Sequence, residues 1–121
     1  MSTPDKDQTK YVTGYAPKDI ETRVVKSFLD ILILIEMKKQ SNLSGYDITS
    51  FVNERFGGIL SPGTVYATIY AIERKGLIEG KNDGRKTVYA LTAKGNDVVA
   101  SMMENFHKEM GEFVGKFLVI K

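Results

Sequence analysis

The sequence predicts a mainly α-helical domain with one small β-hairpin (α+β), and three observations point to this fold class. Apolar residues recur at steps of three and four over most of the chain, which is the spacing of a buried helix face. The segment Asn82-Asp83-Gly84-Arg85 interrupts that spacing and favours a hairpin turn. The length of 121 residues, with 42% hydrophobic and 26% charged residues, suits one folded domain.

The composition excludes several classes of function. The sequence has no cysteine and a single histidine, His107, which excludes a disulfide, a thiolate metal site and a histidine-rich metal centre. The longest apolar run, Phe28 to Ile35, is far shorter than the roughly 20 residues of a membrane span. No Gly-rich phosphate loop or spaced carboxylate pair marks an enzyme. We expect no catalytic residue, metal, cofactor or membrane partner, and the absence of a secretory signal predicts a cytoplasmic protein.

The N-terminal part of the chain changes character near residue 19. Residues 1–18 mix Pro, Gly, Asp, Lys and Thr without apolar periodicity, which predicts a flexible arm. From Ile20 onward the apolar residues fall on one helical face. They predict a first helix through Val24, Phe28, Ile31, Leu32 and Ile35.

Two further helices follow, each with a defined start. Residues 40–45 are predicted to form a loop, with Ser44 as the N-cap of a second helix that Gly57-Gly58 ends. Ser61-Pro62 starts a third helix, because Ser is a favoured N-cap and Pro fits the first helical position. The apolar stripe of this helix, and the glycine that ends it, are Val65, Ile69, Ile72 and Gly76.

The last part of the chain predicts a two-stranded ribbon and a long helix. Residues 77–81 and 86–91 have strand-like composition on either side of the turn. Thr92 is the candidate N-cap of a terminal helix, whose apolar face is longer than a domain of this size needs. We therefore expect this helix to pair with a second copy of the chain. The predicted dimerisation residues are Phe28, Val98, Met102, Phe106, Met110, Phe113 and Phe117.

Three helices, a hairpin and a terminal helix are, in that order, typical of a winged helix-turn-helix with a long C-terminal dimerisation helix. This order assigns residues 19–91 to a DNA-binding domain and residues 92–121 to the dimerisation helix. The third helix, over residues 61–75, would then enter the major groove. Its outer face carries small and hydrogen-bonding residues, which a groove about 12 Å wide accepts at close approach.

Cations lie where the hairpin would flank that helix. The wing, residues 81–87, would place Lys81, Arg85 and Lys86 on the DNA backbone or in the minor groove, with Lys75 nearby. Because the net charge is only +2, the electrostatic case for DNA binding rests on the clustering of these cations. A solvated hairpin that only needs solubility is the competing interpretation.

Four blocks of the sequence resemble the PadR family of transcriptional regulators. The blocks are Leu43-Ser44-Gly45-Tyr46-Asp47-Ile48, Leu60-Ser61-Pro62-Gly63-Thr64-Val65-Tyr66, Ile72-Glu73-Arg74-Lys75-Gly76-Leu77-Ile78 and Tyr89-Ala90-Leu91-Thr92-Ala93-Lys94-Gly95. The resemblance covers about residues 24–119 and is to short members with a single C-terminal helix. It implies a homodimeric winged-helix regulator whose terminal helix forms the dimer interface. It also implies that Ser61, Thr64 and Tyr66 lie at the DNA.

Pattern and resemblance together predict a dimeric, sequence-specific regulator of double-stranded DNA, and we expect it to be a repressor. For Tyr66 two roles stay open, a hydroxyl that contacts a phosphate or a ring that only packs, and the same holds for Tyr46 and Tyr89. The predicted DNA-binding residues are Ser61, Gly63, Thr64, Tyr66, Ala67, Thr68, Tyr70, Arg74, Lys75, Lys81, Arg85 and Lys86.

Other functions remain open at this point. One alternative is an architectural protein that coats DNA with little sequence preference, and another is a protein-interaction module that does not bind DNA. A small apolar effector between the two subunits would sit near Phe28, Met102, Met103 and Phe106. Simple packing is the competing role of these residues, because Met and aromatic side chains fill irregular gaps well.

Overall fold

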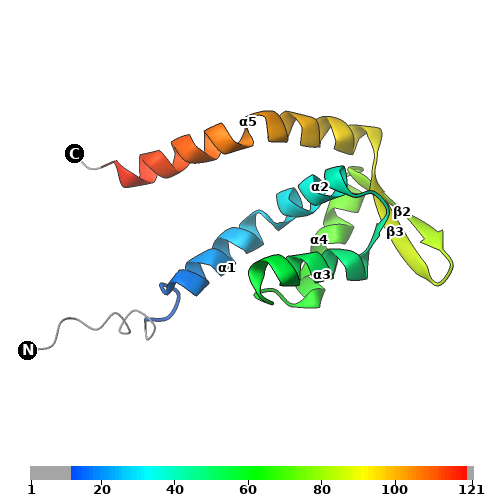
Figure 1. The fold of residues 1–121 in the computed structure, drawn as a ribbon, viewed down its shortest axis with the longest axis horizontal. Helices are drawn as coiled ribbons and strands as arrows, with labels where there is room; N and C mark the ends of the chain where they lie inside the picture. The colour runs from blue at the N-terminus through cyan, green and yellow to red at the C-terminus, as the bar shows by residue number, and fades with distance from the viewer. Residues whose placement is uncertain (1–11, 120–121) are drawn as a thin grey trace, which may run out of the picture.

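The computed structural model describes residues 12–119, which form five helices and three short strands (Figure 1). The order is α1 (Pro17–Ser27), α2 (Leu29–Lys39), β1 (Leu43–Ser44), α3 (Gly45–Phe56), α4 (Pro62–Arg74), β2 (Ile78–Asp83), β3 (Lys86–Leu91) and α5 (Ala93–Leu118). Helices α2, α3 and α4 form a body beside the strands, while α1 and the far half of α5 extend from it toward the same side (Figure 1). The winged helix-turn-helix with a long C-terminal helix is confirmed.

The first predicted helix is in fact two helices. They meet at Phe28, whose φ of −115° and ψ of 17° lie outside the helical region. Helical hydrogen bonds still span the junction, from the Phe28 amide to the Val24 carbonyl and from the Leu32 amide to the Phe28 carbonyl, each 3.0 Å. The prediction of one continuous helix was wrong because the apolar spacing runs through this bend without a break.

Helix α1 begins earlier than predicted, at Pro17, where Pro occupies the first turn. The Asp19 carboxylate accepts a hydrogen bond from the Ala16 amide at 3.2 Å and so satisfies one of the free donors of that turn. The flexible arm predicted for residues 1–18 falls mostly on residues 1–11, which lie outside the described residues.

The three later helix starts occur at the predicted caps. The Ser44 hydroxyl accepts from the Asp47 amide at 3.0 Å, and the Asp47 carboxylate accepts from the Ser44 amide at 2.9 Å. Ser61 caps α4 by accepting from the Thr64 amide at 3.2 Å. Thr92 caps α5 by accepting from the Gly95 amide at 3.0 Å. Each cap contributes about 1 kcal/mol, which is why these residue types mark helix starts in a sequence.

Helix α4 ends at a left-handed glycine, as predicted. Gly76 has a φ of 78°, which a residue with a Cβ adopts only with strain. The Leu77 amide donates to the Ile72 carbonyl at 3.1 Å, and the Gly76 amide donates to the Glu73 carbonyl at 2.9 Å. These two bonds form a Schellman motif, which turns the chain from α4 directly into β2.

The sheet has three antiparallel strands in the order β1-β3-β2. Strands β2 and β3 pair from Ile78↔Leu91 to Asp83↔Lys86, so that Gly84 and Arg85 form the turn. Strand β1 pairs through Leu43↔Tyr89 and Ser44↔Val88. The predicted hairpin is confirmed as β2 and β3. The loop predicted at residues 43–44 was wrong, because β1 adds a third strand that is too short for alternation to reveal.

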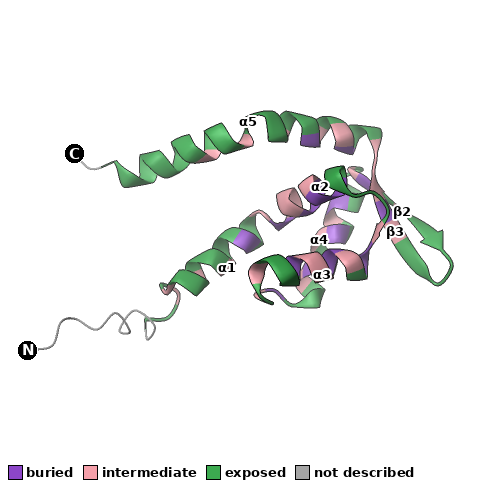
Figure 2. Cartoon of the chain, viewed as in Figure 1, coloured by how far each residue is buried: buried purple, intermediate pink, exposed green. Residues whose placement is uncertain are grey.

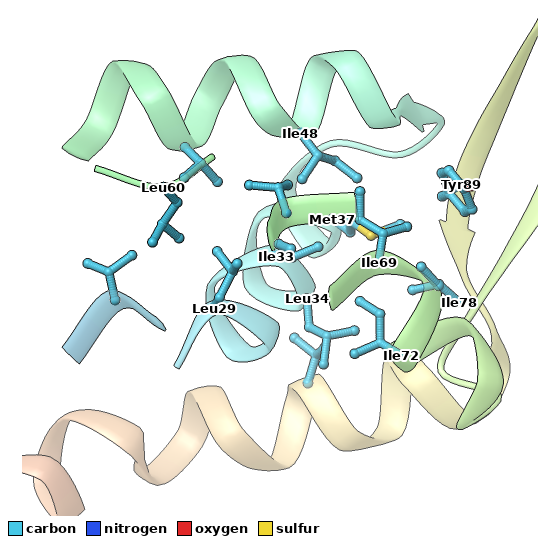
Figure 3. Close-up of a cluster of buried hydrophobic side chains, with 14 residues drawn as sticks. Leu29, Ile33, Leu34, Met37, Ile48, Leu60, Ile69, Ile72, Ile78 and Tyr89 are labelled. Carbon is cyan, nitrogen blue, oxygen red and sulfur yellow. The ribbon is translucent and has the colours of Figure 1, made fainter. Parts of the chain in front are cut away.

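The core lies between α2, α3, α4 and the start of α5 (Figure 3). Helix α5 contributes Val99, which is fully buried, whereas residues 111–119 are all exposed (Figure 2). Helix α2 is covered on most sides, and α1 buries only Val25. The buried apolar residues are Val25, Leu29, Ile33, Leu34, Met37, Ile48, Val52, Leu60, Val65, Ile69, Ile72, Ile78, Tyr89 and Val99.

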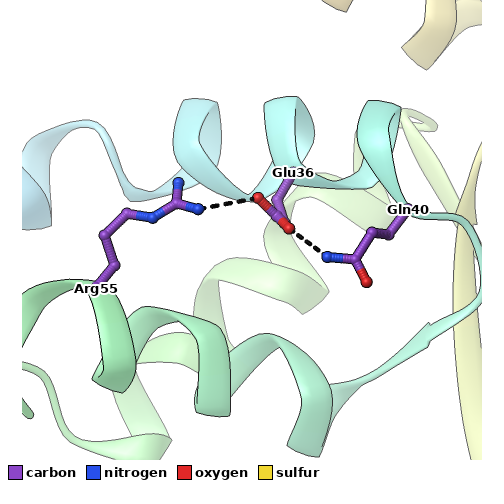
Figure 4. A network of polar contacts seen from close by, with 3 residues as sticks. All are labelled: Glu36, Gln40 and Arg55. Carbon is purple, nitrogen blue, oxygen red and sulfur yellow. Dashed lines mark hydrogen bonds and ion pairs between the residues drawn. The ribbon is translucent and has the colours of Figure 1, made fainter.

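One acid is buried between α2 and α3. Glu36 is 4% exposed, and its carboxylate accepts hydrogen bonds from Arg55 at 3.3 Å and from Gln40 at 2.6 Å (Figure 4). A buried charge needs such partners because its transfer out of water is costly. The Arg55 contact therefore ties α3, the first helix of the helix-turn-helix, to the central helix α2.

Candidate nucleic-acid interface

Helix α4 has a buried face and an open face. Val65, Ile69 and Ile72 are buried in the core, as their spacing predicts. The opposite side carries Ser61, Gly63 and Ala67, all exposed, with half-buried Thr64, Thr68 and Ala71 beside them. The open face thus has short side chains along its first two turns, which a DNA major groove admits without steric conflict.

Hydroxyl groups line the start of this open face. The Ser61 and Thr64 hydroxyl oxygens lie 3.0 Å apart, and the Thr68 hydroxyl donates to the Thr64 carbonyl at 3.0 Å. These contacts hold the side chains in defined positions before any partner arrives. The first turn of α4 also carries the positive end of the helix dipole, which favours a phosphate.

The predicted cations occupy two places. Lys81, Arg85 and Lys86 are exposed on the hairpin, with Arg85 in the turn itself. Arg74 and Lys75 are exposed at the last turn of α4, at the opposite end of that helix from Ser61. The ion pair between Lys81 and Glu79, at 3.8 Å, is exposed on both sides and so holds Lys81 only weakly.

A groove of about 490 Å³ lies between helix α4 and the hairpin. Residues 44–47 at the start of α3 form one wall, and Tyr66 and Tyr70 of α4 form the second. Lys86, Thr87 and Tyr89 of β3 complete it. We call this feature the tyrosine groove. Sequence reasoning placed Tyr66, Tyr70 and Lys86 at the DNA, but it left Tyr46 and Tyr89 undecided and did not include Ser44 or Thr87.

Tyr66 is half-buried and packs against the start of α3. A Cβ added to Gly45 would overlap the Tyr66 ring, so glycine permits this close approach. The Tyr66 and Tyr70 rings lie 6.1 Å apart between centroids with an interplanar angle of 47°. Tyr66 therefore has a packing role, and its ring also forms part of the groove wall.

The pKa values of two ionisable groups in the groove differ from their ordinary values. The Ser44 amide and then the Ser44 hydroxyl, both hydrogen-bonded to the carboxylate, hold the pKa of Asp47 below its ordinary value, and the charge of Lys86 adds to the effect. Burial, and then the charge of Glu73, raise the pKa of Tyr89. Asp47 is thus held as the carboxylate that caps α3, and the hydroxyl of Tyr89 keeps its proton.

The predicted dimerisation residues change from half-buried to exposed along α5. Val98, Met102, Phe106 and Met110 are half-buried, and Phe113 and Phe117 are 50% and 74% exposed. The Phe113 and Phe117 rings contact edge to face, with centroids 4.9 Å apart. Solvent thus reaches the apolar stripe of α5 increasingly toward its end.

An apolar cavity of about 250 Å³ lies between α1, α2 and α5. Of the residues predicted to surround an effector, Phe28 and Phe106 line it. Met102 packs on the core and Met103 is 46% exposed, and neither lines the cavity. Val24, Ile31 and Met110 add to its wholly apolar wall.

Residues 12–119 contain neither a membrane-spanning helix nor a cluster of metal-ligating side chains. No helix in this part of the chain combines the length and apolarity that crossing a membrane requires. The same residues contain no group of three His, Cys, Asp or Glu side chains placed to hold a metal ion.

The fold and this surface define a winged helix-turn-helix protein of the DNA-binding class. A family model described as the transcriptional regulator PadR-like family matches residues 31–101, which is more than half of the chain. The chain belongs to the PadR-like family of transcriptional regulators. Regulators of this family are DNA-binding proteins and not enzymes.

Solved structures share the fold. A PadR-like transcriptional regulator from Bacillus cereus is 19% identical, with a TM-score of 0.68 over 81% of this chain and 99% of that chain. A PadR family regulator from Eggerthella lenta is 20% identical, with a TM-score of 0.68 over 84% and 91% of the two chains. A transcriptional regulator from Thermoplasma acidophilum is 18% identical, with a TM-score of 0.65 over 82% and 99%. A search of curated proteins found no match to this sequence.

Proposed function

We propose that two copies of this chain form a repressor that binds a pseudo-palindromic operator. Each copy inserts the open face of α4 into the major groove, and its wing places Arg85 and Lys86 on the backbone or in the minor groove. The observation that carries the proposal is the open face itself, where small and hydroxyl side chains stand beside an exposed cationic hairpin. A major groove admits such a face, and phosphates attract such a hairpin.

The proposed dimer rests on the two elements that extend from the body. Helix α5 has 26 residues and so spans about 39 Å, yet every residue from Gly111 to its end is exposed. Phe113 and Phe117 at its end, and Ile20 and Val24 on α1, expose apolar surface that a single chain does not cover. A two-fold arrangement would bury this surface and would present two α4 helices to half-sites about 34 Å apart.

We further propose that a small apolar effector binds at this interface. The cavity of about 250 Å³ between α1, α2 and α5 supports this, since its wall offers no polar group. Titration of anilinonaphthalene sulfonate into the protein, with and without DNA, tests it. An effector site predicts saturable fluorescence and altered DNA affinity. If the probe binds but DNA affinity is unchanged, the residues around the cavity serve only for packing and not as an effector site.

The function is tested by selection of binding sites from a random duplex library with the full chain. A regulator predicts enrichment of one inverted repeat, and affinity for it at least a thousandfold above random DNA at equal salt. Salt-sensitive binding without enrichment would support an architectural protein. The absence of binding at low and high salt would leave a protein-interaction module.

A further inference from the structure

Tyr89 is the most buried tyrosine of the tyrosine groove. The residue is 6% exposed, and its ring lies on β3 in register with Leu43 and Gly80. The side chain nevertheless lines the groove. Within residues 12–119 no hydrogen bond joins its hydroxyl to another group. The hydroxyl oxygen is also not sealed from solvent, so the otherwise buried side chain presents its hydroxyl to the groove.

A hydroxyl in such a place is available to a ligand. The packed ring holds it in a fixed position, and no protein group competes for its hydrogen bond. Burial and the charge of Glu73 raise the pKa of Tyr89, so the hydroxyl stays protonated and is available as a donor. The expected ligand atom is therefore a hydrogen-bond acceptor.

The other walls of the groove favour an anion. Lys86 lies at its edge, close enough for its charge to lower the pKa of Asp47. The start of α3 adds the positive end of a helix dipole. The two nearby carboxylates already have partners, since Asp47 accepts from the Ser44 amide at 2.9 Å and Glu73 accepts from the Gly80 amide at 3.3 Å.

The place of the groove identifies the anion. It lies between α4 and β3, so that one wall belongs to the helix proposed to enter the major groove and another to the wing. With α4 in the major groove, a DNA strand that borders it would pass over this position. We propose that the tyrosine groove binds one phosphate of the DNA backbone, with the Tyr89 hydroxyl as its hydrogen-bond donor and Lys86 as its cation. This inference rests on the proposed function.

The test uses Tyr89→Phe, which removes the hydroxyl and keeps the ring. Its affinity for a selected site should fall by roughly tenfold, the effect of one lost hydrogen bond to a charged group. The fall should be equal on random DNA, because a phosphate contact carries no sequence information. Tyr15→Phe is the matched control, since Tyr15 precedes α1 and is 66% exposed.

A second measurement locates the contact. In duplexes with one neutral methylphosphonate linkage, the wild-type protein should lose affinity at one linkage in each half-site. The neutral linkage at that position should weaken the binding of Tyr89→Phe only slightly, because the substitution and the neutral linkage remove the same interaction. If Tyr89→Phe unfolds, Lys86→Gln takes its place, because Lys86 is exposed and is the cation proposed for the same site.

The outcomes separate the two proposals. If the wild-type protein binds no DNA, the proposed function fails and the phosphate site fails with it. If the wild-type protein binds but Tyr89→Phe binds equally well, or loses affinity only for one base sequence, the phosphate site alone is overturned.

Discussion

At the scale of single residues, glycines show how closely the elements approach one another. Gly95 lies in the first turn of α5, where a Cβ would overlap the Leu77 carbonyl. That carbonyl also accepts from the Thr92 amide at 3.0 Å, so the contact fixes how α5 leaves the sheet. Gly111, in the same helix, has open space where a Cβ would stand.

We predict opposite effects of alanine at these two positions. Gly95→Ala should lower the free energy of unfolding by about 2 kcal/mol or more, because the backbone carbonyl it meets cannot move aside. Gly111→Ala should raise it by up to about 1 kcal/mol, since alanine is the better helix former. Urea unfolding followed by circular dichroism measures both. Equal effects of the two substitutions would contradict the close approach of α5 to Leu77.

At the scale of elements, the cap of α3 makes the fold sensitive to acid. The Ser44 amide holds the pKa of Asp47 below its ordinary value, so the folded state favours the carboxylate. A lowered folded pKa stabilises the protein above the unfolded value, near 3.8, and the contribution disappears as the pH falls through the folded pKa. The cap should therefore be fully effective at neutral pH.

Asp47→Asn tests this linkage. The variant should be less stable than the wild type at about pH 7, and the difference should shrink as the pH falls below about 4, where the wild-type carboxylate takes up a proton. The urea midpoint at each pH is the measurement. Asp83→Asn, at the exposed end of β2, removes the same charge without a cap and serves as the control. A constant difference between Asp47→Asn and wild type at all pH values would contradict the argument.

The wing is the second element with a testable role. Arg85→Ala and Lys86→Ala should each weaken binding to specific and random DNA alike. Each should also reduce the slope of log affinity against log salt concentration by about one. Fluorescence anisotropy at several salt concentrations gives both quantities. Lys18→Ala, exposed on α1, should leave the slope unchanged, and an unchanged slope for the wing variants would remove the wing from the interface.

At the scale of the whole molecule, the far end of α5 exposes apolar surface that the proposed dimer would cover. From Gly111 to Val119 no residue of α5 is buried, although Phe113, Phe117 and Leu118 are apolar. The core ends near Val99 and the half-buried Met102. Most of the stability of a helix comes from packing on its apolar face, so a second copy that covers these last turns would stabilise them.

Phe113→Asp should convert the proposed dimer into a monomer. A charge in an apolar interface is costly, so the mass in light scattering should fall from twice 13.5 kDa to 13.5 kDa. DNA affinity should fall with it, because two linked half-sites bind far more tightly than one. Ser101→Asp, exposed on the same helix away from Phe113, should stay dimeric. A wild-type protein that is already monomeric would refute the interface.

Local signals determined most of the fold. Ser44, Ser61 and Thr92 act as caps in the structure as they do in the sequence, and Gly76 ends α4, because each of these effects depends only on neighbouring residues. The open and buried faces of α4 follow from helical spacing in the same way. The family could also be recognised from four short blocks of sequence.

Contacts between distant segments decided the rest. The bend at Phe28, the short strand β1 and the burial of Val99 depend on what each segment meets across the fold, and apolar spacing does not record that. The tyrosine groove is the clearest case. Tyr46, Tyr66 and Tyr89 lie on three elements, and only the pairing of β1 with β3 and the packing of α3 on α4 bring them together. A sequence pattern specifies which way a side chain faces on its own element, whereas the tertiary structure decides which other side chains it meets.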